Sequence, residues 1–206
     1  MLSWRFPDKP HDTCSNFVEN LRENEWLCSA KLDGWNASIY TDENQVATIF
    51  SRSNRVLKDV TNVPTFILEQ VEALAKGIPP QSVINAEFVG PRGNHQPGLY
   101  VFDSLAWDGE WLSFTPFEKR WHLVETVVAR HISGGIHLAE TVDTDFMGLF
   151  SRLKKIWYDG GCSKLDLCEG IVLKRRTGGL TLDRNSSSKS RHQFKLKYRE
   201  ILEKRY

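Results

Sequence analysis

The stretch Trp26-Leu27-Cys28-Ser29-Ala30-Lys31-Leu32-Asp33-Gly34 places a lysine at the end of an apolar run, directly before an Asp-Gly pair. An Asp-Gly pair between two such runs is typical of a tight turn. Short strands are therefore expected on both sides of the turn, over 26–32 and 36–40. The pattern predicts that the charged side chain of Lys31 lies on a strand beside a turn.

Helix signals occur in three places further along the chain. Pro64 stands where a helix would begin, apolar residues follow at roughly helical spacing, and Gly77 ends the segment. Thr115-Pro116-Phe117-Glu118 is a capping box, which predicts the start of a second helix. We expect helices over 64–76, 115–131 and 145–158, and further strands over 45–51, 82–89, 98–106, 170–175 and 193–197.

Strands and helices mix in this order without regular βαβ alternation, and neither GxGxxG nor GxxxxGK[ST] occurs. The order favours an α+β fold, with antiparallel sheets flanked by helices, over a doubly wound fold. The length of 206 residues suits a single domain, 1–206, with a core of its own. Residues 177–190 are rich in Gly and Ser, so we expect a mobile loop there.

The composition is that of a globular protein, with 40% apolar and 26% charged residues. No apolar run approaches the roughly 20 residues of a membrane helix, and the N-terminus lacks the pattern of a secretion signal. The four cysteines have no CxxC spacing, which favours cytosolic thiols over disulfides or a zinc site. We therefore expect a cytoplasmic protein, or a viral protein that acts in the host cytoplasm, without a membrane partner.

Charge is distributed unevenly along the chain. The net charge is +1, but residues 174–206 contain 11 Lys or Arg and 3 Asp or Glu, a local balance of +8. Such a basic end favours a phosphate-rich partner. A solvated face with excess lysine is the alternative that charge alone leaves open.

Four short segments combine charge with predicted strands. They are Lys31-Leu32-Asp33-Gly34, Ala86-Glu87-Phe88-Val89-Gly90, Glu169-Gly170-Ile171-Val172-Leu173-Lys174 and Lys195-Leu196-Lys197. A lone KxDG or KxK pattern is common by chance, whereas EGxVxK is rare, and the ordered set is more specific than any member.

The chemistry of these segments is that of phosphate binding. Residues two apart on a strand share a face, so Lys195 and Lys197 would project together and suit a polyphosphate. Their charge would also lower the pKa of a third lysine nearby, which is a route to a nucleophilic Lys31. Glu87 and Glu169 could hold ribose hydroxyls or a divalent metal, since Mg²⁺ often takes one or two carboxylates together with substrate phosphates.

The ordered set resembles the covalent nucleotidyltransferase superfamily of ATP-dependent DNA ligases, RNA ligases and mRNA-capping guanylyltransferases. Two further segments, Ser51-Arg52-Ser53-Asn54 and Leu99-Tyr100-Val101-Phe102-Asp103, resemble motifs of the same superfamily, and the likeness extends over about residues 26–198. It implies a nucleotide cleft between sheets. Within the superfamily, the chain is most similar to the nucleotidyltransferase domain of a minimal ATP-dependent polynucleotide ligase.

The resemblance implies a role for each matched residue. Lys31 would attack the α-phosphate of ATP and hold AMP as a phosphoramidate, and Glu169 would help to place Mg²⁺ (or Mn²⁺). Nucleotide contacts would come from Ala30, Arg52, Glu87, Phe102, Lys195 and Lys197, with Glu87 at the ribose and Phe102 stacked on the base. Nucleic-acid contacts are expected at Arg52, Arg175, Arg176, Lys189 and Arg191.

Two departures from the superfamily pattern affect what is expected. Asn36 stands where DNA ligases and capping enzymes usually have arginine, and asparagine there is more similar to phage-type and editing-type RNA ligases. The segment from Thr115 to Arg120, by contrast, resembles a helix start of DNA ligases. The chain stops nine residues after Lys197, so no C-terminal OB domain is expected, and a separate polypeptide, a fragment or a minimal enzyme would explain this.

Three functions remain open from the sequence. The first is a ligase that adenylates Lys31, transfers AMP to a 5′-phosphate and seals an RNA or DNA strand. The second is a capping-type guanylyltransferase that uses GTP. The third is a non-catalytic nucleic-acid-binding module that uses the basic end.

Overall fold

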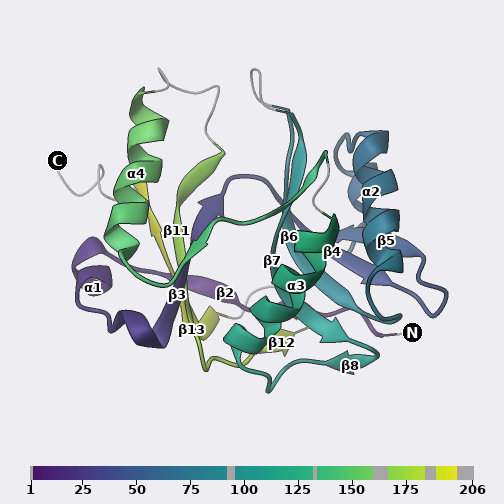
Figure 1. Ribbon diagram of the computed structural model, residues 1–206, viewed down its shortest axis with the longest axis horizontal. Coiled ribbons are helices and arrows are strands. Elements are labelled where there is room, and N and C mark those ends of the chain that lie inside the picture. The colour runs from purple at the N-terminus through teal and green to yellow at the C-terminus, as the bar shows by residue number, and fades with distance from the viewer. Residues whose placement is uncertain (1, 92–95, 132–133, 160–166, 184–188, 199–206) are drawn as a thin grey trace.

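The computed structural model describes residues 2–91, 96–131, 134–159, 167–183 and 189–198. Two large sheets form the frame, and helices cover the outer face of each (Figure 1). A two-stranded sheet joins β1 (Phe6–Pro7) to β12 (Leu182–Asp183). Within the described part of the chain, no helix is long and apolar enough to span a membrane.

The six-stranded sheet is formed by the middle of the chain. Its order is β5 (Ala47–Ser51), β4 (Trp35–Thr41), β6 (Val83–Val89), β7 (Gly98–Trp107) and β8 (Glu110–Trp111), and β9 (Ile136–Leu138) pairs with β7. The helices α2 (Thr65–Lys76) and α3 (Phe117–His131) pack on one face of this sheet (Figure 1). The short 3₁₀ helix η2 (Leu57–Asp59) follows β5.

The five-stranded sheet combines both ends of the described chain. Its order is β10 (Thr141–Val142), β3 (Trp26–Leu32), β11 (Cys168–Arg175), β13 (Lys189–Lys197) and β2 (Lys9–Asp12). The helix α4 (Phe146–Asp159) covers its outer face, together with α1 (Ser15–Glu19), and the 3₁₀ helix η1 (Glu23–Glu25) precedes β3.

Strand periodicity separates an apolar face from a polar face in each sheet. On β6, Ile84, Ala86 and Phe88 pack against α2 and α3, while Asn85 and Glu87 face the other way. On the five-stranded sheet the apolar side chains of Cys28, Ile171 and Leu196, among others, pack against α4. The polar faces of the two sheets are therefore the ones left to line a space between them.

Gly34 lies where the chain passes from one sheet to the other. β3 belongs to the five-stranded sheet and β4 to the six-stranded sheet, so Asp33 and Gly34 connect the two. A Cβ atom on Gly34 would lie 2.3 Å from the carbonyl oxygen of Phe88. Only glycine allows this approach, and it fixes Lys31 beside the junction of the sheets.

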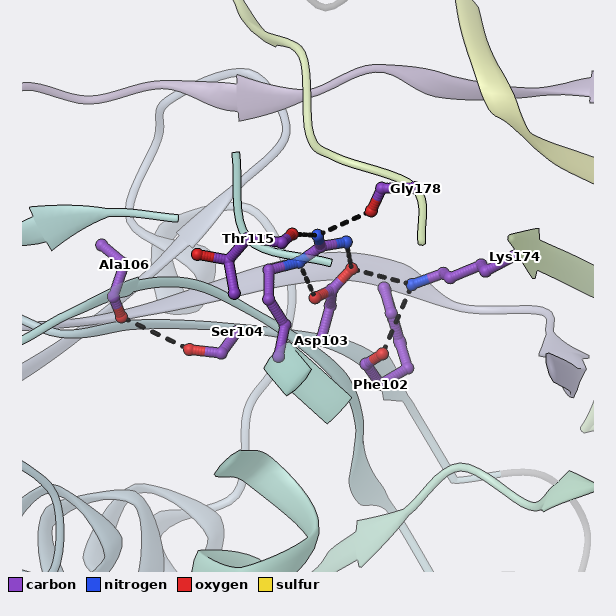
Figure 2. Close-up of polar contacts among 8 residues, drawn as sticks. Phe102, Asp103, Ser104, Ala106, Thr115, Lys174 and Gly178 are labelled. Atoms are coloured by element: carbon purple, nitrogen blue, oxygen red, sulfur yellow. Dashed lines mark hydrogen bonds and ion pairs between the residues drawn. The ribbon is translucent and has the colours of Figure 1, made fainter. Parts of the chain in front are cut away.

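A buried ion network also joins the two sheets (Figure 2). Asp103 of β7 accepts hydrogen bonds from Arg120 Nε of α3 at 2.9 Å and from Lys174 Nζ of β11 at 3.0 Å. The three side chains are 2%, 1% and 6% exposed, respectively. Arg120 also donates to the carbonyl oxygens of Thr115 and Gly178, so most of the buried donors are satisfied.

The predicted α+β class is confirmed, and the predicted helices and strands are all present with ends that differ by at most four residues. The sheets are not wholly antiparallel, because β2 pairs in parallel with β13 and β9 in parallel with β7. The short elements β1, β2, β8, β9, β10, β12, α1, η1 and η2 were not predicted. Each is five residues or shorter, too short for a period to be recognised.

Part of the segment 177–190, which was expected to be a loop, packs on the fold or forms strands. The N–H of Leu180 donates to Ser113 O at 2.8 Å, and the Leu180 side chain is buried, so this part of the segment packs on the fold. Leu182–Asp183 forms β12, and residues 189–190 begin β13. Residues 184–188 lie outside the described residues. The glycine and serine content predicted a loop here, because local composition carries no information about the pairing of β12 with the distant strand β1.

Replacing Asp103 with alanine is expected to destabilise the fold strongly. The change leaves two buried cations without their counter-charge, which typically costs about 3–5 kcal/mol. Urea unfolding of Asp103→Ala and of the surface control Glu72→Ala, which lies exposed on α2, measures the difference. A loss no greater than that of the control would contradict the assigned role of the network.

Candidate active site

The polar faces of the two sheets and the N-terminal stretch enclose a cleft of about 400 Å³. This volume is within the range of small-molecule sites. Both sheets contribute charged side chains to its wall, and so do the residues just before β2. The sequence-predicted residues that line it are Ala30, Lys31, Arg52, Glu87, Phe102, Glu169 and Lys195.

Lys31 and Lys197 lie in one row across three neighbouring strands, with Gly170 between them. Lys31 of β3 and Lys197 of β13 are both paired with Gly170 of β11. Gly170 has φ +153°, and a Cβ there would lie 1.9 Å from Leu196 O, so glycine is required. No side chain at 170 separates the two lysines.

Glu169 is the shared partner of these two lysines. Its Oε1 forms an ion pair with Lys31 Nζ, and its Oε2 lies 3.0 Å from Lys197 Nζ. Burial acts to raise the pKa of Glu169, but the hydrogen bonds and charges of Lys31 and Lys197 outweigh it and hold that pKa below its ordinary value. The carboxylate is thus ionised and links Lys31 to a cation of the last motif.

Lys195 has a different partner from Lys197. Its Nζ lies 2.9 Å from Asp12 Oδ1, at the end of β2. Lys195 and Lys197 project from the same face of β13, as predicted. The nearest charged group to Lys31, however, is the carboxylate of Glu169 rather than either lysine, so the expected like-charge environment of Lys31 is not what the structure shows.

Glu87 faces Lys31 from the six-stranded sheet. Burial raises the pKa of Glu87 to about 7, and Glu169 acts in the same direction, while Lys31, the Gly34 N–H and Arg52 oppose the shift. The Arg52 guanidinium lies 4.4 Å from the centre of the Phe6 ring, and burial lowers its pKa, against the attraction of Glu87. A carboxyl group that titrates near neutral pH is typical of functional sites.

Phe102 and Val172 line the cleft from opposite sheets. Lys174 Nζ lies 4.8 Å from the centre of the Phe102 ring and donates to the Phe102 carbonyl oxygen at 3.3 Å (Figure 2). The ion network therefore also fixes the backbone and ring of Phe102. The predicted contact at Ala30 can come only from its backbone, because its side chain packs in the core beside α4.

Several polar atoms in the cleft wall have no hydrogen-bond partner within the described chain. They include Asn36 Oδ1, Asn85 Oδ1 and Arg52 Nε, all shielded from solvent. Buried polar atoms are normally paired, so those facing a cavity indicate that a polar ligand supplies the partners. Asn85, Lys9, Asp12 and Val172 were not singled out as site residues from the sequence.

The other predicted nucleic-acid contacts do not all lie together. Arg175 pairs with Glu25 at 3.2 Å, Arg176 pairs with Glu118 at 2.7 Å, and Lys189 lies 4.0 Å from Asp12. Arg175 and Arg191 both line a groove beside α1, together with Arg22 and three aromatic residues. The structure therefore brings Arg175 and Arg191 together and separates Arg176 from them.

A divalent metal would have two carboxylates available in the cleft. Glu87 and Glu169 lie close enough for their charges to interact. Among the residues that the structure describes, no group of three or more His, Cys, Asp or Glu side chains could hold a metal ion. The pair fits Mg²⁺ bound through one or two carboxylates and phosphate oxygens rather than in an all-protein cage.

Comparison with known structures finds proteins of similar fold. Mycobacterial DNA ligase D, complexed with ATP and MES, superposes with a TM-score of 0.64 at 22% identity, over 93% of this chain and 60% of that one. The ligase domain of M. tuberculosis LigD gives 0.64 at 22% identity, over 93% and 59%. An archaeal ATP-dependent RNA ligase gives 0.51 at 15% identity, over 92% and 47%. The chain thus spans 60% or less of these three proteins.

The fold is that of the nucleotidyltransferase domain of polynucleotide ligases. A sequence profile of the RNA ligase family matches residues 24–197, most of the chain, so the protein belongs to the RNA ligase family. A comparison with curated proteins finds no match. The matched region begins just before β3 and includes every motif identified in the sequence.

The raised pKa of Glu87 predicts a pH-dependent stability. Between an ordinary value of 4.5 and the folded value of about 7, the folded state keeps a proton that the unfolded state releases. Stability contributed by this group is therefore lost as pH rises through this window. Glu87→Gln removes the titration, so its stability relative to the wild type should rise across the window by up to about 3 kcal/mol.

Urea unfolding of both proteins at several pH values between 4.5 and 7 measures this effect. Glu69→Gln, an exposed change on α2, is the matched control and should follow the wild type at every pH. Parallel curves for Glu87→Gln and the wild type would show that Glu87 titrates normally.

Proposed function

We propose that this protein is an ATP-dependent, ligase-like adenylyltransferase that forms a covalent Lys31–AMP intermediate and transfers AMP to a polynucleotide end. The observation that supports this most directly is the position of Lys31. Its side chain lines a cleft together with Glu87, Glu169 and Lys195, and the Phe102 ring lines the same cleft. Membership of the RNA ligase family is independent support.

In the first step the neutral Lys31 amine attacks the α-phosphorus of ATP. A P–N bond forms, the bond from the α-phosphorus to the bridging oxygen breaks, and pyrophosphate leaves. Lys31 must lose its proton, and the contacting Glu169 carboxylate is the nearest acceptor. A divalent metal held by Glu87 or Glu169 would offset phosphate charge, and Lys195 and Lys197 would do so from β13.

The cleft walls offer matching contacts for the rest of the nucleotide. Phe102 and Val172 would hold the base between the two sheets, and Glu87 and Asn36 would meet ribose hydroxyls. In the second step a 5′-phosphate oxygen would attack the phosphorus of Lys31–AMP and restore the amine. A 3′-hydroxyl would then attack the activated 5′-phosphate, release AMP and seal the strand.

The nucleic acid would be held partly outside the cleft. Arg175 and Arg191, with Arg22 beside them, are the better candidates among the predicted basic residues, because they share one groove. Arg175, Arg176 and Lys189 would each have to exchange a carboxylate partner for a phosphate. A separate polypeptide with an OB domain remains a candidate partner, and RNA and DNA are both candidate substrates.

Lys31→Ala is expected to abolish covalent labelling by α-labelled ATP, because it removes the amine that is proposed to attack the α-phosphorus. Lys31→Arg should fail as well, because a guanidinium does not lose its proton at working pH. The exposed Lys119→Ala on α3 is the control and should be labelled like the wild type. Denaturing electrophoresis detects the adduct.

The same gel separates the candidate functions. Label from ATP supports the adenylyltransferase, and preferential label from GTP would favour the capping alternative. Wild-type labelling of Lys31→Ala would contradict the central assignment, and no label from either nucleotide would favour a binding module.

Glu169→Ala is expected to reduce the labelling rate at least about a hundredfold, the usual scale for removing a group that positions or deprotonates a nucleophile. EDTA should have a comparable effect on the wild type if a divalent metal takes part. Binding of Mn²⁺ together with ATP, followed by its paramagnetic signal, gives a readout besides activity. Undiminished labelling by Glu169→Ala would exclude the role, whereas the control Glu72→Ala, exposed on α2, should leave the rate unchanged.

A further inference from the structure

The strand β2 brings to the cleft a lysine that no motif predicted. β2 runs parallel to β13, with His11 paired with Phe194 and Asp12 with Lys195. The N–H of Thr13 donates to Lys195 O at 3.0 Å, which ties the end of β2 to the last motif. Lys9 and Lys195 consequently line the same end of the cleft from neighbouring strands.

Arg52 reaches the same end from the six-stranded sheet. It follows directly after β5, and its guanidinium lies over the ring of Phe6, which is only 1% exposed. Phe6 belongs to the N-terminal stretch that continues into β2, so the surface supporting Arg52 and the strand bearing Lys9 are consecutive in the chain. Arg52 Nε is buried and has no hydrogen-bond partner within the described chain.

The cations at this end repel one another. Partial burial lowers the pKa of Lys9, and the charges of Arg52 and Lys195 lower it further. Among the described residues, neither Lys9 nor Arg52 has an ion-pair partner within the usual distance. A group of cations held together against repulsion, and facing a cavity, is a built site for an anion.

Two carboxyl groups face the same region, and one of them, Asp12, is already paired with two lysines. Asp12 is engaged by Lys195 at 2.9 Å and by Lys189 at 4.0 Å. Asp8 is 6% exposed, and its burial raises its pKa, against hydrogen bonds from Ser190 and Thr181. Glu87 attracts Arg52 from the other side, toward Lys31.

We propose that Lys9, Arg52 and Lys195 form a phosphate subsite next to Lys31, with Lys9 as a binding residue for the proposed ligase reaction. Three positive side chains from three elements suit a doubly charged phosphate group, which a guanidinium and two ammonium groups can contact at different oxygens. The inference rests on the proposed function for the identity of the ligand. Two phosphates could occupy the subsite: the β- and γ-phosphates of ATP that leave as pyrophosphate, or the 5′-phosphate of a strand end.

Direct binding distinguishes the two sources. Inorganic pyrophosphate, a 5′-phosphorylated oligonucleotide and its 5′-hydroxyl counterpart are titrated calorimetrically into the wild type, Lys9→Ala, Lys9→Arg and the exposed control Lys76→Ala. Losing a charge-assisted hydrogen bond should weaken binding about tenfold or more. Lys9→Ala should lose this for a phosphate-bearing probe and leave the 5′-hydroxyl oligonucleotide unchanged, while Lys9→Arg and Lys76→Ala should bind like the wild type.

The results for the two phosphate-bearing probes assign the subsite or overturn it. Weaker pyrophosphate binding alone assigns the subsite to the leaving group, and weaker binding of the 5′-phosphorylated strand alone assigns it to the strand end. Unchanged affinity of Lys9→Ala for both probes, or equal loss for the 5′-hydroxyl strand, overturns the proposal. Urea unfolding of each variant shows whether the fold is intact, and a folded Lys9→Arg with wild-type affinity tests the charge itself.

These titrations need no covalent step, so they separate the subsite from the proposed function. If the wild type never becomes labelled by ATP yet Lys9→Ala binds pyrophosphate or the 5′-phosphorylated strand less tightly, the subsite stands and the adenylyltransferase does not. If labelling occurs and Lys9→Ala binds both probes like the wild type, the adenylyltransferase stands and the subsite does not.

Discussion

The carboxylate of Asp103 holds two buried cations that come from opposite sides of the cleft. Arg120 belongs to the helix that covers the six-stranded sheet, and Lys174 belongs to the central strand of the five-stranded sheet. Breaking this network would leave unpaired charge in the interior, which is far more costly than losing a surface ion pair. The separation of the two sheets, and with it the width of the cleft, depends on these contacts. Lys174 also bonds to the backbone of Phe102, so the same interaction places the aromatic wall.

The chemistry of the cleft follows from how its charges are paired. Lys31 and Lys197 share Glu169, and Lys195 is held by Asp12. Glu87 is partly buried and has a pKa near neutrality. Each proposed phosphate-binding lysine of β13 thus has a carboxylate that phosphate oxygens could replace. The pairing keeps several cations close together while limiting repulsion, and it gives the nucleophile a proton acceptor in direct contact.

Much of this arrangement could be predicted from the sequence, and the remainder could not, for physical reasons. The long strands and helices and the fold class follow from local periodicity. The cleft positions of Lys31, Glu87, Phe102, Glu169 and Lys195 were expected from the resemblance of their motifs to the superfamily. The partner of each lysine could not be predicted, because Glu169 meets Lys31 through a register of β11 with β3 that only the tertiary structure defines. Lys9 and Asp12 lie on a four-residue strand that has no recognisable pattern of its own. Leu180 appeared to belong to a loop because its hydrogen-bond partner, Ser113, is far away in the sequence.

The central claim is that the Lys31 amine forms a bond to AMP, and peptide mapping by mass spectrometry after incubation with ATP and Mg²⁺ tests it most directly. The account predicts an intact protein heavier by one adenylyl group, with the added mass confined to the peptide that contains Lys31 and removed again by excess pyrophosphate. An adduct located on another residue, or a protein whose mass never changes while it still binds ATP, would contradict it.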